Sequence, residues 1–114
     1  MWIRVAKDKT ALGVGSEGHT YIEGDAMEEF YFDEDTASAL DEDHFLEEMW
    51  DKFDAMFDWG DCDFFDVDQC KALAQWLQKR LLRELPGNVR QVYETMLNFT
   101  DIAVINMTGI YFDF

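Results

Sequence analysis

The sequence predicts an α+β fold, in which a small, mostly antiparallel sheet formed from both chain ends packs on two or three central helices. Short apolar segments of strand character lie near both ends, and apolar residues recur at helical spacing in the middle. Helices and strands do not alternate along the chain, which argues against a doubly wound sheet. With 114 residues, about half of them apolar, we expect a single domain over residues 1–114 with a real core.

The first third favours short strands separated by turns. Ile3 and Val5 alternate with polar or small residues, and a turn at residues 8–10 would return the next apolar segment as the second strand of a hairpin. The expected strands are residues 2–7, 11–14, 19–23 and 29–33.

The centre favours helices. The first is expected to begin at a cap formed by Thr36 or Asp41 and to end before Trp59–Gly60. Its apolar stripe would consist of Phe45, Met49, Phe53 and Met56 or Phe57. Residues 61–67 then form a loop with at most a short extended piece.

Two more helices are expected before the last strands. One begins at a cap formed by Asp68 and extends to about Leu85, where Pro86–Gly87 stops it. The next covers about residues 89–99. The segments 102–107 and 110–114 are rich in β-formers and flank Thr108–Gly109, so they predict a strand or a terminal hairpin.

Acidic residues are concentrated in one part of the chain. Residues 10–51 contain fourteen Asp and Glu and no Lys or Arg, and Lys52 is the only Lys or Arg within residues 10–70. Residues 71–114 are nearly balanced, and the formal net charge is −16. Such a field repels nucleic acid and acidic lipid and attracts basic proteins. We therefore expect a basic protein partner, and no direct binding of nucleic acid or membrane.

Motifs for cofactors and metals are weak. Gly13–Gly18 matches G-x-G-x-x-G, but a strand-like segment follows where a dinucleotide site needs a helix, so we interpret these glycines as turn residues. Five Asp crowd residues 58–68, yet an EF-hand register starting at Asp61 places Asp66 where Gly is required. We expect no cofactor, and we leave open whether this loop binds a cation.

The His and Cys residues give no catalytic pattern. Asp41, His44 and Glu47 would share a helix face, but a di-iron bundle needs that arrangement twice. Cys62 and Cys70 form no C-x-x-C pair, and no segment has the pattern of a signal peptide or a membrane span. We therefore expect a reduced, cytoplasmic protein without catalytic activity.

Aromatic residues stand among the acids of the middle segment. We expect most of them to lie in the core, whereas one or two exposed rings would anchor a partner inside a charged rim. They are Trp50, Phe53, Phe57, Trp59, Phe64 and Phe65.

The chain resembles the small acidic immunity proteins that bacteria make against nuclease toxins. The resemblance is based on overall size, acidity, a strand-rich start, the acidic aromatic middle and the helix opening Asp66–Leu77. It implies that the acids of residues 33–63 cover the positively charged substrate cleft of a toxin. The candidate partner-binding residues are Asp33, Glu34, Asp35, Asp41, Glu42, Asp43, Glu47, Asp51, Asp58, Asp61 and Asp63.

Two other uses of an acidic surface stay open. Carboxylates along an extended edge would imitate the phosphates of DNA, as in an anti-restriction or anti-CRISPR inhibitor. A mimic needs acids in a long double row and an inhibitor needs a compact patch, and concentration of the acids in one half favours the patch. The third possibility is a domain whose acidity serves only solubility.

Overall fold

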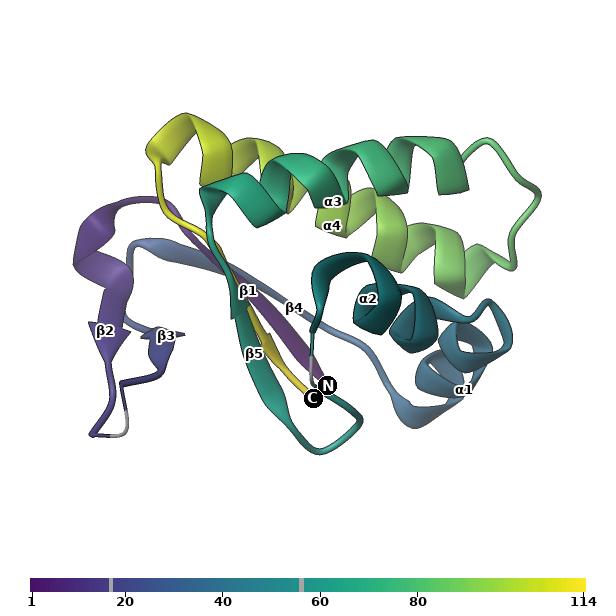
Figure 1. Cartoon of the computed structure of the whole chain (residues 1–114), viewed down its shortest axis with the longest axis horizontal. Helices are drawn as coiled ribbons and strands as arrows, with labels where there is room; N and C mark the ends of the chain where they lie inside the picture. The colour runs from purple at the N-terminus through teal and green to yellow at the C-terminus, as the bar shows by residue number, and fades with distance from the viewer. Residues whose placement is uncertain (17, 56) are drawn as a thin grey trace.

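Both chain ends lie in one four-stranded antiparallel sheet with the order β4-β1-β6-β5 (Figure 1). The structure is a computed structural model that describes residues 1–16, 18–55 and 57–114. The elements are β1 (Trp2–Ala6), η1 (Lys9–Ala11), β2 (Leu12–Val14), β3 (Thr20–Ile22), β4 (Met27–Tyr31), α1 (Glu34–Glu42), α2 (Phe45–Phe53), β5 (Cys62–Phe65), α3 (Val67–Arg80), α4 (Gly87–Asn106) and β6 (Ile110–Asp113). The predicted α+β class, with a sheet from both ends, is confirmed.

One face of the sheet packs on the helices. The strand register pairs Ile3 with Phe112 and Val5 with Ile110, and all four side chains are fully buried. Because side chains alternate along a strand, these residues project from the same face. Figure 1 shows α3 and α4 side by side along the sheet, with α1 and α2 at one end of the molecule. None of the helices in the described residues is long and apolar enough to cross a membrane.

The opposite face is partly covered by a hairpin of β2 and β3. Ala6, Ala11 and Ile22 form a small second core there, apart from the main one. The expected hairpin of residues 2–7 with residues 11–14 was wrong, since β2 pairs with β3. The physical reason is that β4 and β6 already occupy both sides of β1. Glu17, which falls between β2 and β3 in the sequence, lies outside the described residues.

The expected single middle helix is two helices. His44 adopts a left-handed conformation with φ of 62° and separates α1 from α2. The cap of α1 is neither Thr36 nor Asp41, because the Asp33 side chain accepts a hydrogen bond from the Thr36 N–H at 2.9 Å. α2 ends at Phe53, and Met56, expected on the apolar stripe, lies outside the described residues.

The expected strand over residues 102–107 was also wrong, because α4 continues to Asn106. Phe99 and Ala103 are buried four residues apart and extend the apolar stripe of the helix, so packing overrides the β-propensity of the segment. Met107 then ends the helix with φ of 56°. Gly109 follows, where a Cβ atom would overlap the Phe64 ring and the Phe65 carbonyl.

The cap of α3 lies two residues earlier than predicted. Asp66, and not Asp68, accepts a hydrogen bond from the Gln69 N–H at 2.9 Å, while the Gln69 side chain accepts one from the Asp66 N–H at 2.9 Å. This capping box satisfies two N–H groups that would otherwise lack partners. The helix ends at Arg80, earlier than the expected Leu85.

Candidate functional site

The exposed acids at the end of α1, on α2 and in the turn that follows form the candidate site, which we call the acidic surface. One contact joins its two parts. The Trp59 indole N–H donates to both carboxylate oxygens of Asp41, at 2.9 Å to each. In the same turn the Asp58 N–H donates to Asp61 Oδ2 at 3.3 Å. The acidic surface consists of Asp41, Glu42, Glu47, Asp51, Asp54, Asp58 and Asp61, all exposed.

Two of these acids follow one face of α2. Glu47 and Asp51 are four residues apart, so their side chains project from the same side of the helix. His44 Nδ1 lies 3.4 Å from Glu47 Oε2, and both side chains are about two-thirds exposed. This pair therefore leaves the charge of Glu47 accessible to a partner.

Three candidate acids lie at the start of α1. Asp33 is the helix cap, and the hydrogen bond from the Thr36 N–H lowers the pKa of its carboxyl. Glu34 and Asp35 occupy the first turn, where negative side chains interact favourably with the helix dipole. All three side chains are exposed, so they stay accessible to a partner although they also stabilise the helix.

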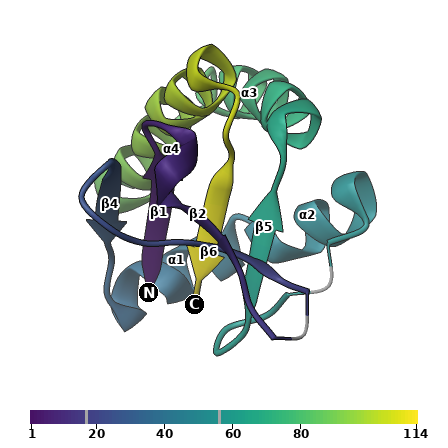
Figure 2. The same cartoon turned by 90° about the vertical axis from the view of Figure 1, so that its left-hand side faces the viewer.

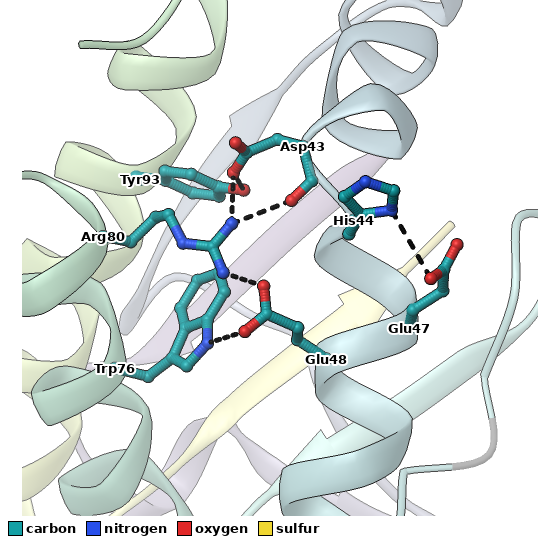
Figure 3. Close-up of polar contacts among 7 residues, drawn as sticks. All are labelled: Asp43, His44, Glu47, Glu48, Trp76, Arg80 and Tyr93. Carbon is teal, nitrogen blue, oxygen red and sulfur yellow. Dashed lines mark hydrogen bonds and ion pairs between the residues drawn. The ribbon is translucent and has the colours of Figure 1, made fainter. Parts of the chain in front are cut away.

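Asp43 differs from the other candidates because it is enclosed (Figure 3). Arg80, only 5% exposed, donates from Nη1 to the Asp43 backbone oxygen at 2.8 Å and to its carboxylate at 2.9 Å. The Tyr93 hydroxyl donates to the same carboxylate oxygen at 2.6 Å. Burial, together with this hydrogen bond, raises the pKa of Tyr93 above its ordinary range. Asp43 therefore holds the corner between α1 and α2 against α3 and α4.

Glu48 completes this enclosed network. Its carboxylate pairs with Arg80 Nη2, and it accepts a hydrogen bond from the Trp76 indole N–H at 3.2 Å. The Arg80 guanidinium also lies over the Trp76 ring, 4.6 Å from its centroid. Sequence reasoning missed this network, since its members come from α2, α3, α4 and the junction between α1 and α2, and no local pattern joins them.

Asp63 lies apart from the helical acids. It is half-buried on β5, where burial raises the pKa of its carboxyl. It lines a hollow of about 420 Å³ together with His19 and Cys62. The structure therefore does not bring Asp63 together with the acids of α1 and α2.

Trp50 supplies an aromatic group beside the acids. Phe57 and Phe65 are buried, as expected for core residues, whereas Trp50 is 40% exposed. Its indole N–H donates to the Phe57 carbonyl at 2.7 Å, which fixes the ring. A hollow of about 430 Å³ is lined by Trp50, Asp54, Ala55, Phe57 and Asp58. Asp54 was not among the predicted site residues.

Metal-ligating and thiol side chains are the remaining groups whose placement bears on this site. Within residues 1–16, 18–55 and 57–114, no group of three or more His, Cys, Asp and Glu side chains is placed to hold a metal ion. Both cysteines are free thiols, and burial raises the pKa of Cys70 to about 12. A thiol with this pKa is almost entirely protonated at neutral pH and is a poor nucleophile.

The chain was compared with protein-family models, with curated proteins and with solved structures, and none of them matches it.

Proposed function

We propose that this chain is a protein-binding domain of the immunity type, whose acidic surface covers the basic cleft of a toxin or nuclease. The observation that supports this most directly is the hollow beside Trp50, where an ordered, exposed indole adjoins the carboxylates of Asp54 and Asp58. Aromatic anchors inside a charged rim are typical of protein interfaces. The acids around the hollow would steer a basic partner and raise its association rate.

The placement of the acids favours a compact patch. α1 and α2 lie together at one end of the molecule, and the turn with Asp58 and Asp61 is joined to α1 through Trp59 (Figure 1). The molecule measures 37 × 27 × 25 Å and is not elongated. A long double row of carboxylates, which a DNA mimic requires, is not favoured by this shape.

Partner capture from native cells tests the proposal. The immobilised protein is loaded at low salt and eluted with rising salt, and the eluted proteins are identified by mass spectrometry. The expected result is one basic nuclease or toxin that resists moderate salt. Capture of a DNA-binding protein would favour the mimic instead. A mixture of basic proteins released at low salt would contradict specific binding and favour the solubility role.

Charge reversal then tests the surface. In one variant Asp41, Glu42, Glu47 and Asp51 are replaced by Lys, and its control carries Lys at Asp68, Glu84, Glu94 and Asp101, which are also exposed. Both variants change the net charge equally. The first should weaken binding of the captured partner at least about tenfold more than the control, because it removes the local attraction. Equal loss in both would show that only the overall charge matters.

A further inference from the structure

The outer edge of β4 is unpaired. β4 is the last strand on one side of the sheet, and Figure 2 shows it outermost there. Two backbone hydrogen bonds mark the ends of the β1–β4 pair. The Phe32 N–H donates to the Met1 carbonyl at 3.0 Å, and the Lys7 N–H donates to the Ala26 carbonyl at 2.8 Å. In an antiparallel pair such bonds recur at every second residue. The backbone N–H and C=O groups of Met27, Glu29 and Tyr31 therefore point outward, and no other described residue bonds to them.

A hollow of about 230 Å³ lies beside this edge. Phe30, Phe32 and Val92 supply apolar surface, while Asp33 and Gln91 supply polar groups. The Thr36 N–H occupies only part of the hydrogen-bonding capacity of the Asp33 carboxylate, which accepts at several sites. The low pKa of Asp33 keeps it charged. An aliphatic stem ending in a cation matches this combination of an apolar wall and a fixed carboxylate.

The charge around the strand also favours a basic ligand. Arg4 pairs with Glu29 at 3.2 Å, and Lys7 lies 3.9 Å from Glu28, so the strand itself is nearly neutralised. The excess negative charge lies at its two ends. These acids are Glu23 and Asp25 before the strand, and Asp33, Glu34 and Asp35 after it.

We propose that β4 binds an extended, Lys- or Arg-containing segment of a protein partner as an added strand. The ligand backbone pairs with Met27, Glu29 and Tyr31, and one basic side chain enters the hollow that ends at Asp33. Strand addition obtains affinity from the backbone hydrogen bonds and specificity from the pockets for alternate side chains. This inference rests on the proposed function, and it names the partner's binding element.

A second copy of the chain is a poorer occupant. Pairing β4 with its own copy would bring together two molecules that each carry a net charge of −16, with acids at both ends of each strand. Like charges held close together destabilise such an association. Charge complementarity therefore selects the basic segment.

Peptide titration tests the edge directly. The probe is acetyl-Thr-Lys-Val-Arg-Val-Lys-Thr-amide, added to the ¹⁵N-labelled protein. Two control peptides are methylated on alternate backbone nitrogens, in the two possible phases. Because only every second N–H faces β4, one phase should bind within about twofold of the parent and the other at least about tenfold more weakly. Shift changes and slowed amide exchange should centre on Met27, Glu29 and Tyr31.

A matched pair of variants checks the same contact from the protein side. Glu29→Pro removes one outward N–H and keeps the ladder to β1, whereas Glu29→Thr removes the carboxylate alone. The proline variant should bind the peptide about fivefold more weakly than the threonine variant. Native thermal unfolding of both variants confirms the fold, and the methylated peptides decide the question if the proline variant does not fold.

Three outcomes would overturn the added strand: equal binding of both methylated peptides, shift changes confined to α1 and α2, or no binding at about 1 mM peptide. The first two leave the proposed function intact, because a basic peptide would then have bound through charge alone. Failure of the proposed function is seen separately, when reversal of the four acids leaves partner affinity unchanged. Concentration-dependent sedimentation without peptide would favour the second copy and also overturn the inference.

Discussion

Carboxylates in the same short segment serve two different purposes. Asp43 and Glu48 face Arg80, a buried cation, and hold α1 and α2 against α3 and α4. Asp41 and Glu47, a few residues away, contact Trp59 and His44 and remain exposed to solvent, where a partner can reach them. The difference follows from position in the fold, because the enclosed pair lies within reach of α3 and the exposed pair does not. Local density of charge therefore does not measure the charge available for binding.

The largest expected effect comes from the cation of the enclosed network. Arg80→Met leaves Asp43 and Glu48 without their common partner and should lower the free energy of unfolding by about 3 kcal/mol. This is at the low end of the range for buried pairs because the Glu48 side chain is 36% exposed. Arg83→Met, at an exposed position close by, should change stability by no more than about 0.5 kcal/mol. Urea unfolding measures both.

Adding Asp43→Asn and Glu48→Gln to Arg80→Met sharpens that prediction. These changes remove the uncompensated charges, so part of the lost stability should return. If the Arg80 and Arg83 variants unfold at the same urea concentration, the enclosed acids are no more structural than the exposed ones.

A second prediction concerns acids that act through a helix end. Asp66→Ala removes the capping box of α3 and should lower the free energy of unfolding by about 1 kcal/mol. Asp68→Ala, two residues further on in the first turn of the helix, should lower it by less than half as much. Both variants lose one negative charge, so the comparison isolates the hydrogen bond. Thermal unfolding of the two variants measures the difference. Equal melting temperatures would mean that the Asp66 side chain does not stabilise the start of α3.

The fold was predictable where the signal was local. Alternation at Ile3 and Val5 gave β1, and the spacing D-x-x-Q at Asp66–Gln69 was a visible capping signal, although the prediction placed the cap at Asp68. The β-branched residues near Ile102 indicated a strand, but burial of Ala103 under the sheet keeps that segment helical. Propensity is a weak guide where packing on a distant element decides the conformation.

The candidate site was predictable only in part. The exposed acids followed from composition, since charged side chains stay in water unless they find a partner. Enclosure of Asp43 was not predictable, because Arg80 is 37 residues away in the sequence. The unpaired edge of β4 also depends on strand order, which a sequence does not give.

A third prediction uses the effect of salt on stability to distinguish the exposed acids from the enclosed ones. Repulsion among the exposed acids is screened by salt, and the buried ion pairs are screened much less. Raising NaCl from about 0.02 to about 0.3 M should therefore increase the melting temperature by about 2–4 °C. Reversal of Asp41, Glu42, Glu47 and Asp51 halves the net charge of −16, so the increase should be smaller in that variant. An equal increase in both proteins would mean that the acidic surface does not repel itself measurably.

The smallest expected effect tests Asp63, which belongs to neither class. Burial raises the pKa of its carboxyl, so the ionised form is less favourable in the folded than in the unfolded protein. The resulting loss of stability is present above the folded pKa and disappears as pH falls below the unfolded value. Asp63→Asn should therefore be more stable than Asp51→Asn near neutral pH by a few tenths of a kcal/mol, and the advantage should vanish by about pH 3. Urea unfolding across this interval measures it. An advantage that persists in acid would show that Asp63 is disfavoured for its shape or hydrogen bonding, and that burial of its charge is not the cause.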